Sequence, residues 1–286
     1  MAHSMEGKVC LITGATSGIG AATAMELAML GATTIIVGRN RRKCERISQR
    51  IKRKTENEAV EFLAADLSSQ QEVRYLAAEF KNRHNHLAVL INNAGAIFAK
   101  RQQTADGIEM TFALNHLAYF LLTNLLLDCL KASPSARIVV VASVAHNKGT
   151  LRFDDLQGER HYDRLEAYRQ SKLANVLFAY ELARRLAGTR VSVNALDPGS
   201  VATNLGRNNS WLRTRMRNLL VRSMVNPQEG ARTVVYLASC PEVEGKTGHY
   251  FKNQKEIPSS DGSHDTSVAR GLWLVSEELT GVRFPN

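Results

Sequence analysis

The sequence predicts a single α/β domain built on a doubly wound parallel sheet. Short apolar segments alternate with helical segments about six times along the chain. The apolar segments are continuous runs, as expected for strands whose two faces are both covered by helices. The first of them leads into a glycine-rich turn, which is typical of a Rossmann-type sheet. No linker rich in proline, glycine or serine divides the 286 residues, so we expect one domain.

The first half of the chain gives the expected elements in strand–helix order. Residues 8–13 form a short apolar run, typical of a buried strand, and residues 21–30 have helical composition and stop at Gly31. The β-branched run 33–37 predicts the second strand. The elements that follow are a charged helix over residues 41–54, a strand over 60–64, a helix over 69–83 and a strand over 87–91.

The second half begins with a long helix expected over residues 107–130. Its most apolar part, 117–130, is too short and too polar to span a bilayer and therefore predicts a buried helix. A strand over 137–142, a helix over 165–186 and a strand over 191–195 follow. We expect residues 5–200 to form a dinucleotide-binding and catalytic core.

The pattern becomes less regular after about Ser200, so residues 201–286 are expected to supply a substrate lid and a C-terminal segment. Residues 208–225 combine several arginines with apolar side chains around Trp211. This helical excursion fits a mobile lid over an apolar substrate, attachment to a membrane surface, or a packed amphipathic helix. Residues 257–286 are expected to form a C-terminal extension with a last helix.

Composition limits the classes of function. The formal net charge is +10, but the basic cluster at residues 39–54 has no interleaved aromatic side chains, which argues against nucleic-acid binding. The four cysteines include no C-x-x-C pair, which is typical of free thiols in a reducing compartment. His84 and His86 lack the cysteine or carboxylate partners of a metal site. No signal peptide is visible, so we expect a cytoplasmic protein. We also expect that the protein needs no metal.

The glycine-rich turn at residues 13–20 is the first candidate binding motif. Glycines there let the backbone approach a pyrophosphate, and the helix that follows offers free N–H groups and a partial positive charge. The spacing is G-x-x-x-G-x-G rather than the common G-x-G-x-x-G, and a tight strand–helix connection is the alternative interpretation. The expected cofactor contacts in this turn are Gly14, Thr16, Ser17, Gly18, Ile19 and Gly20.

The end of the second strand bears on cofactor choice. A carboxylate at this point would bind the ribose 2′-hydroxyl of NAD, but the strand runs into Gly38 and Arg39. A cation suits the 2′-phosphate of NADP, so Arg39 predicts NADP(H). A solvated helix start is the alternative, and for Arg41 and Arg42 the two interpretations are equally good.

Four polar residues form a candidate catalytic set. Tyr168 and Lys172 are four residues apart and share one helix face, where a lysine would lower the pKa of the phenol. Ser143 follows the fifth expected strand and would hold a substrate oxygen beside the tyrosine, unless it only caps a turn. Asn115 is a poor helix former inside the long helix. It is either a buried side chain satisfied by backbone or a site that bends the helix and holds a water.

Taken together, these motifs resemble the short-chain dehydrogenase/reductase family over nearly the whole chain. Each motif is weak alone, and the resemblance depends on their joint occurrence in the family's order. The motifs that carry it are the 13–20 turn, Asp66-Leu67, Asn92 to Gly95, Asn115, Ser143, Tyr168 with Lys172, and Pro198-Gly199. The segments 111–116, 153–156, 170–178 and 276–281 are most similar to the retinol dehydrogenase-like group.

The resemblance implies a role for each residue of the catalytic set. Tyr168 would exchange a proton with the substrate oxygen, and Lys172 would lower its pKa and hold the nicotinamide ribose. Ser143 would bind the substrate oxygen, and Asn115 would support a water-mediated proton relay. The further cofactor contacts that it implies are Asp66, Leu67, Asn93, Ala94, Gly95, Pro198, Gly199, Val201 and Thr203.

The resemblance also implies a reaction and a partner. The expected activity is NADP(H)-dependent interconversion of a carbonyl and an alcohol, as in carbonyl reductases and retinol dehydrogenases. Membrane-bound members carry an N-terminal anchor that is not seen here, so a small apolar aldehyde or ketone is expected rather than a retinoid. His146 and Asn147 follow Ser143 and are expected at the substrate mouth. A homo-oligomer built on the long helices 107–130 and 165–186 is also expected.

A protein that binds NADP(H) without catalysis, or that serves as a scaffold, is the alternative function on the same fold. Such a protein has no need of Asn115, Ser143, Tyr168 and Lys172 together, which favours the enzyme.

Overall fold

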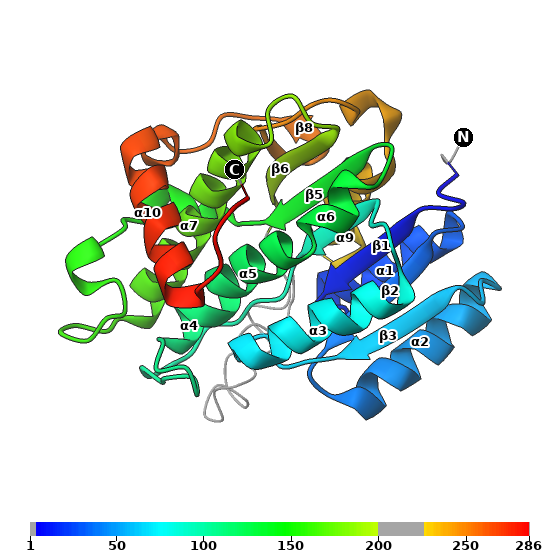
Figure 1. The fold of residues 1–286 in the computed structure, drawn as a ribbon, viewed down its shortest axis with the longest axis horizontal. Helices are drawn as coiled ribbons and strands as arrows, with labels where there is room; N and C mark the ends of the chain where they lie inside the picture. Colours follow the sequence, from blue (N-terminus) through cyan, green and yellow to red (C-terminus); the bar gives the residue numbers. More distant parts are fainter. Residues whose placement is uncertain (1–3, 200–225, 286) are drawn as a thin grey trace.

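The computed structural model describes residues 4–199 and 226–285, and their arrangement is a central sheet between two layers of helices (Figure 1). The sheet has eight strands in the order β3-β2-β1-β4-β5-β6-β7-β8. All neighbouring pairs are parallel except β7 and β8, which are antiparallel. This confirms the expected Rossmann-type, doubly wound fold in a single domain.

The strands are β1 (Val9–Thr13), β2 (Thr33–Gly38), β3 (Val60–Ala64), β4 (Val89–Asn92), β5 (Ala136–Val141), β6 (Val191–Asp197), β7 (Tyr250–Lys252) and β8 (Lys255–Glu256). The α-helices are α1 (Gly18–Met29), α2 (Arg41–Thr55), α3 (Gln70–Arg83), α4 (Met110–Phe112), α5 (Ala118–Leu125), α6 (Leu127–Lys131), α7 (Arg164–Arg185), α9 (Pro227–Ser239) and α10 (Thr266–Thr280). Two shorter helical segments that matter for the site are the π-turn η1 (Ala113–Leu117) and the 3-10 turn η2 (Val144–Lys148).

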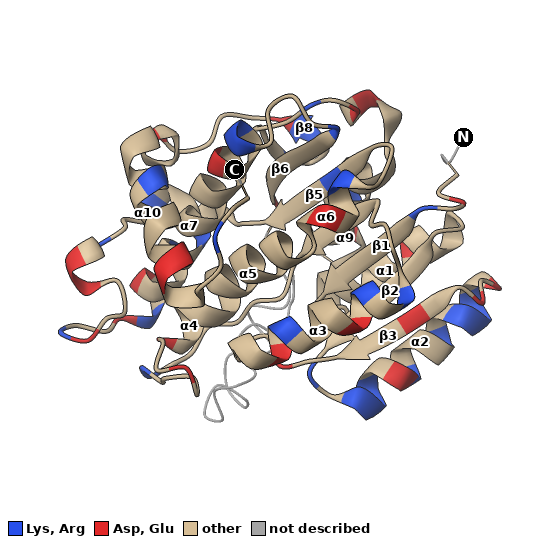
Figure 2. Ribbon diagram, viewed as in Figure 1, with Lys and Arg blue, Asp and Glu red and all other residues tan. Residues whose placement is uncertain are grey.

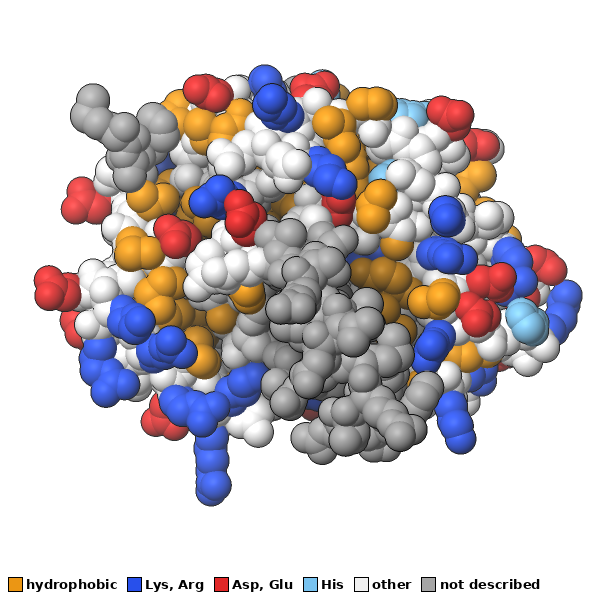
Figure 3. All heavy atoms as spheres, turned by 180° about the vertical axis from the view of Figure 1, so that it is seen from behind, with side chains coloured by type: hydrophobic (Ala, Val, Ile, Leu, Met, Phe, Trp, Pro, Cys, Tyr) orange, Lys and Arg blue, Asp and Glu red, His pale blue; other side chains and the backbone are white. Residues whose placement is uncertain are grey.

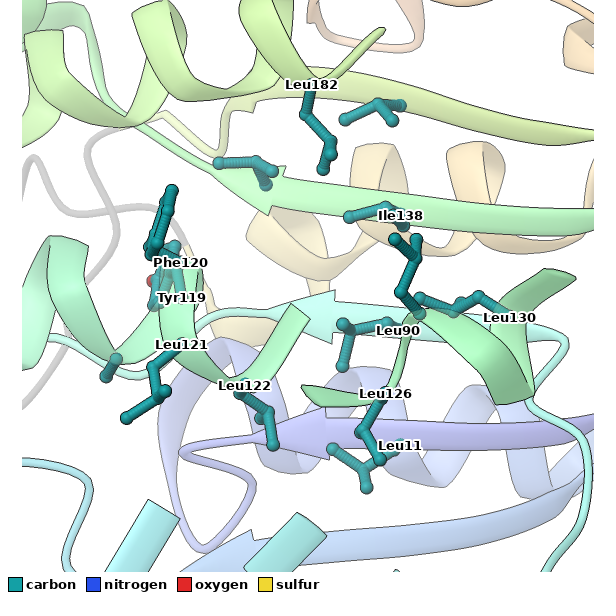
Figure 4. Close-up of a cluster of buried hydrophobic side chains, with 14 of the residues drawn as sticks. Leu11, Leu90, Tyr119, Phe120, Leu121, Leu122, Leu126, Leu130, Ile138 and Leu182 are labelled. Atoms are coloured by element: carbon teal, nitrogen blue, oxygen red, sulfur yellow. The ribbon is translucent and has the colours of Figure 1, made fainter. Parts of the chain in front are cut away.

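Both faces of the sheet are buried, because neighbouring residues of each central strand enter different hydrophobic clusters. Leu11 of β1 packs in the cluster that lies under α3, α5 and α7, shown in Figure 4, whereas Ile12 packs in the cluster under α1 and α9. The continuous apolar pattern of the strands therefore has the physical cause that was expected from sequence.

The segment expected as one long helix over 107–130 is interrupted twice. It consists of α4, the π-turn η1, α5 and α6, and Asn115 lies within η1. A π-turn inserts one extra residue into a helix and is frequent at functional sites. The helix departs from α geometry at Asn115, in line with the local bend expected there from the poor helix propensity of asparagine.

The part of the chain after residue 225 is more regular than the sequence suggested. Helix α9 packs against α1, and β7 pairs in parallel with β6 and so extends the sheet. Helix α10 packs along α7, where Trp273 lies between Phe120 of α5 and Phe178 of α7, with ring centroids 4.9 and 6.0 Å away. Figure 1 shows α10 covering α7 on the side nearest the viewer.

The exposed face of α2 is strongly basic, and it is visible in Figure 2 and at the lower left of Figure 3. Its last turn carries Lys52, Arg53 and Lys54, where cations interact favourably with the carboxyl end of a helix dipole. The other end of α2 points toward the cleft described below.

Candidate active site

A cleft of about 330 Å³ opens at the carboxyl ends of the central strands. Strand β1 pairs with β2 on one side and with β4 on the other, so the strand order reverses at this point. Ligands of doubly wound sheets bind at such a reversal. Of the cofactor contacts expected from sequence, the cleft brings together Gly14, Thr16, Ser17, Gly18, Ile19, Gly20, Arg39, Asp66, Leu67, Asn93, Ala94, Gly95, Lys172 and Pro198.

The turn between β1 and α1 forms one wall of the cleft and is held close to the end of β4. Thr13 Oγ1 accepts hydrogen bonds from the backbone N–H groups of Asn93 (2.8 Å) and Ala94 (3.0 Å). Asn93 Nδ2 in turn donates to the Thr13 carbonyl at 2.7 Å. A Cβ atom at Gly14 would lie 2.9 Å from Ala94 Cα, and one at Gly20 would lie 2.6 Å from Asn93 Nδ2. Only glycine fits at these two positions.

The first turn of α1 is suited to an anionic ligand. Ser17 is the N-cap residue, but its side chain accepts no capping hydrogen bond, and the first turn contains no acidic residue. The N–H groups at this end of the helix therefore face the cleft without a side-chain acceptor from the cap, and the helix dipole adds a partial positive charge. A pyrophosphate fits this cradle.

Two cations line the cleft beyond the end of β2, and sequence reasoning found only one of them. Arg39 was expected, whereas Lys43 was missed. Asn40 caps α2 by accepting from the Lys43 backbone N–H at 2.9 Å, so Lys43 lies in the first turn of the helix, at the end that borders the cleft. Arg41 points elsewhere, because its guanidinium lies 5.6 Å from the centre of the Phe62 ring. A lysine three residues after an N-cap asparagine was the signal in the sequence.

Tyr168 and Lys172 line the other end of the cleft, and Ser143 lies beside Tyr168. Tyr168 and Lys172 lie one turn apart on α7, with Lys172 Nζ 5.7 Å from the centre of the Tyr168 ring. Lys172 Nζ also donates to the Val141 carbonyl at 3.0 Å. Ser143 follows β5 and caps η2, and its side chain is near enough to the Tyr168 hydroxyl to affect the pKa of that phenol. A phenol and an ammonium group thus line one end of the cleft, with the Ser143 hydroxyl next to the phenol.

The electrostatics of this group differ from the expectation in one respect. Burial raises the pKa of Tyr168, the hydrogen bond with Ser143 opposes that shift, and the charge of Asp197 adds to it. Burial also lowers the pKa of Lys172 to about 8, although Asp197 opposes this. Lys172 is not among the causes of the Tyr168 shift, and its ammonium group donates to the Val141 carbonyl. That Lys172 lowers the pKa of Tyr168 during catalysis stays a prediction.

Asn115 lies behind the catalytic group and connects two parts of it. Its side-chain oxygen accepts from the Ala96 N–H at 2.9 Å, and its amide nitrogen donates to the Ala96 carbonyl and to Ser171 Oγ, both at 3.0 Å. Ser171 Oγ donates to the Tyr168 carbonyl at 2.8 Å. Asn115 therefore ties the loop after β4 to the helix that carries Tyr168, which is the buried, backbone-satisfied state that the sequence left open.

The remaining expected residues lie apart from the cleft or outside the described residues. Gly199 donates its N–H to Asp197 at 3.1 Å and does not line the cleft. Val201, Thr203 and the expected lid over 208–225 lie outside the described residues. His146 was expected at the substrate mouth, but only 2% of it is exposed.

Neither a metal site nor a membrane span was found in the described part of the chain. No group of three or more histidine, cysteine or acidic side chains there is placed to hold a metal ion. No helix within residues 4–199 and 226–285 is long and apolar enough to cross a membrane.

Comparison with known proteins agrees with this geometry. The sequence model of one family, described as short chain dehydrogenase, matches residues 8–212. The chain belongs to the short-chain dehydrogenase family. Within this family it is retinol dehydrogenase-like: it is 45% identical to human retinol dehydrogenase 14, with 97% of this chain and 88% of that protein covered. It is 44% identical to human polyprenol dehydrogenase, with 96% and 86% covered.

Solved structures of the short-chain dehydrogenase fold are also similar. A crystal structure of a protein from Mycobacterium Paratuberculosis is 34% identical, with a TM-score of 0.81 and coverage of 100% of this chain and 97% of that chain. An active-site complex of RhlG from Pseudomonas aeruginosa with NADP is 25% identical, with a TM-score of 0.70 and coverage of 91% and 98%.

Proposed function

We propose that this short-chain dehydrogenase is an NADP(H)-dependent oxidoreductase that interconverts an apolar aldehyde or ketone and its alcohol, with Tyr168 as the acid/base. The observation that carries the proposal is that Tyr168 and Lys172 line one end of a cleft, with Ser143 beside Tyr168, while two cations line its other end. NADP(H) would supply the hydride or accept it, and the protein supplies binding, orientation and a proton.

The residues that line the cleft support NADP(H) as the cofactor. The uncapped N-terminus of α1 would hold the pyrophosphate, and Arg39 with Lys43 would hold the 2′-phosphate. The cleft walls that would flank the adenosine are formed by Asp66 and Leu67 on one side and by Asn93 to Gly95 on the other. The complex of RhlG with NADP supports this choice of cofactor by similarity.

The hydroxyl groups of Ser143 and Tyr168 would have different roles at the substrate oxygen. Ser143 would hold that oxygen by a hydrogen bond, while the phenol of Tyr168 donates its proton to it during reduction. Lys172, held by the Val141 carbonyl, would bind the ribose of the nicotinamide nucleotide and orient the reacting ring toward Tyr168. Asn115 positions this group through Ala96 and Ser171, and a water relay through it stays a prediction.

The raised pKa of Tyr168 means that the phenol is the prevailing form at neutral pH. At neutral pH a phenol with a pKa above 10 is protonated, and this is the form that gives a proton to a carbonyl oxygen. Alcohol oxidation needs the phenolate, so we expect it to be slower at neutral pH and to accelerate in alkaline solution.

An apolar substrate is supported by the surface near the catalytic group and by the relatives. Val144 directly follows Ser143 and Leu165 lies three residues before Tyr168 on α7, and both are large apolar side chains exposed to solvent. Relatives named retinol dehydrogenase and polyprenol dehydrogenase act, by those names, on long apolar alcohols. The lid over 208–225, membrane contact, a homo-oligomer, cytoplasmic location and a functional division near residue 200 stay predictions.

The test is turnover of NADPH with a panel of aldehydes and ketones that includes retinal, medium-chain aldehydes and a steroid ketone. The Tyr168→Phe variant should bind NADPH normally but lose about 100-fold to 10,000-fold in kcat, the range for a general acid. Tyr162→Phe is the matched control, because it removes another partly buried phenol hydroxyl, which donates to the Phe98 carbonyl. NADPH binding without turnover of any substrate would instead favour the non-catalytic function.

A further inference from the structure

A buried histidine lies directly behind Ser143. His146 belongs to η2, three residues after Ser143, and its ring is enclosed by the protein. One ring nitrogen, Nδ1, lies 2.7 Å from the Ser143 carbonyl oxygen. The other, Nε2, lies 3.1 Å from the backbone nitrogen of Ser260, which belongs to the segment after β8. His146 therefore joins the Ser143 turn to a segment more than a hundred residues away.

These two partners determine which nitrogen carries the proton. The backbone N–H of Ser260 is a donor, so Nε2 must accept. The Ser143 carbonyl is an acceptor, so Nδ1 must carry the hydrogen and donate it. Only the neutral Nδ1–H tautomer satisfies both bonds, since a second proton would set an Nε2–H against the Ser260 N–H.

The bond to Ser143 bears directly on the catalytic hydroxyl. The Ser143 carbonyl accepts from both the His146 backbone N–H, at 3.1 Å, and the His146 ring. The Ser143 side chain accepts from the Ala145 N–H at 3.2 Å, and it is near enough to the Tyr168 hydroxyl to affect the pKa of that phenol. The orientation of the hydroxyl thus depends on a turn of a few residues that the histidine ring holds from behind.

We propose that His146 is a positioning residue, whose neutral Nδ1–H tautomer holds the Ser143 turn against the segment at Ser260 and keeps the Ser143 hydroxyl directed at Tyr168. The segment is itself anchored, because Ser259 Oγ lies 2.7 Å from the Tyr180 hydroxyl of α7 and 2.7 Å from Ser263 Oγ. The inference rests on the proposed function only for its effect on turnover, since the tautomer is a property of the structure alone.

The surroundings of His146 favour its neutral form. Burial lowers its pKa below the ordinary 6.5, while the Ser143 carbonyl and the charge of Asp197 at the end of β6 oppose that shift. From β7, Tyr250 stacks at a tilt with a ring-centroid distance of 4.8 Å, and its hydroxyl lies 3.4 Å from Nδ1. From α7, Tyr168 reaches the same turn through Ser143. Protonation at acid pH would set an Nε2–H against the Ser260 N–H, and this repulsion would push the ring away from the Ser143 carbonyl. An asparagine at this position has no group facing Ser260 and would not be pushed.

Two substitutions of His146 test its bond to Ser143 and its bond to Ser260 separately. In His146→Asn the side-chain amide keeps a donor near the position of Nδ1, whereas in His146→Gln the longer amide keeps an acceptor near Nε2. We expect the glutamine variant to lose on the order of 10-fold to 100-fold in kcat, because small displacements of a catalytic group cost that much. The asparagine variant should retain most of kcat, and both should bind NADPH as the wild type does.

The pH profile gives a second readout. The wild-type kcat should fall at acid pH as His146 becomes protonated, and the asparagine variant should lack that fall because it has no titrating ring. His84→Gln serves as control, since His84 lies at the other edge of the molecule beside Glu61 and should leave kcat and its profile unchanged. Equal kcat in the wild type and both variants would overturn the proposal. Equal losses in both variants would overturn it too, because they would assign the effect to packing of the ring.

A measurement without turnover tests the tautomer itself. Long-range nitrogen–proton NMR correlations of the imidazole distinguish the two neutral forms and the charged form, and the His146→Asn spectrum identifies the signal. An Nδ1–H form at neutral pH is the expected result. An Nε2–H or charged form would refute the proposal even in an active enzyme. Lack of turnover by the wild type together with the Nδ1–H form would instead refute the proposed function. The hydrogen bonds that join His146 to Ser143 and Ser260 would then still stand.

Discussion

Cofactor preference offers the sharpest test of the cleft. Arg39 and Lys43 line the same end of it, and we expect each to interact with the 2′-phosphate of NADPH. The perturbations are Arg39→Gln, Lys43→Gln and the double variant. Each single variant removes one positive charge and keeps a polar side chain of moderate length, and the double variant removes both charges.

The magnitude follows from the exposure of the two side chains. A hydrogen bond to a charged group contributes about 1.5–3 kcal/mol, and the lower value applies here because Arg39 is exposed and Lys43 is only partly buried. About 1.4 kcal/mol corresponds to a tenfold change in affinity, so each single variant should raise the KM for NADPH about tenfold. The double variant should raise it less than about 100-fold, since two groups that share one phosphate are not independent.

The assay is the initial rate of carbonyl reduction followed by the absorbance of the reduced nicotinamide, with NADPH and NADH in parallel. The KM for NADH should stay unchanged, because NADH has no 2′-phosphate. Arg41→Gln is the matched control: it removes the same charge from the same helix turn, but its guanidinium lies over Phe62. An equal loss in the control, or an unchanged ratio of NADPH to NADH in the Arg39 and Lys43 variants, would refute the reasoning.

Three further predictions concern packing and titration. Gly20→Val should abolish NADPH binding in a fluorescence titration, because a Cβ at this position would lie 2.6 Å from Asn93 Nδ2; retained affinity would contradict the assigned cradle. Trp273→Ala should lower the free energy of unfolding by about 3–5 kcal/mol, which thermal denaturation would record as a drop in Tm on the order of 10 °C. Because burial lowers the pKa of Lys172 from 10.5 to about 8, the unfolded chain binds more protons between these values, so folding stability should rise with pH across that window. Urea denaturation should show this rise in the wild type relative to Lys172→Met, and parallel curves would contradict it.

The parallel sheet was predictable because its signal is strong and local. Strands β1 and β2 and the last four residues of β5 are runs of mostly apolar or β-branched residues, and only a doubly covered sheet requires that pattern over so many segments. The glycine turn was predictable for a similar reason, since backbone approach to β4 leaves no room for a side chain. Both the burial of the strands and the close backbone approach at the glycines restrict the residue type at single positions, so the sequence records them.

The features that could not be predicted from the sequence depend on contacts with distant residues rather than on a local sequence pattern. Strand β7 has three residues and β8 has two, which is too short for a period to appear; β7 pairs with the edge of β6, and β8 pairs with β7. Lys43 reaches the cleft because α2 begins beside it, and His146 accepts from Ser260 far along the chain. The raised pKa of Tyr168 depends on burial, which no local pattern records.

The position of Trp273 between α5 and α7 affects how the chain folds during its synthesis. The aromatic ring fills a space between α5 and α7, yet it belongs to α10, which the ribosome synthesises more than eighty residues after α7. Until that helix emerges, the nascent chain leaves Phe120 and Phe178 without their cover, and exposed apolar surface of this kind promotes aggregation. Shortened chains that end before residue 266 should therefore accumulate as insoluble material although every residue of the cleft is present.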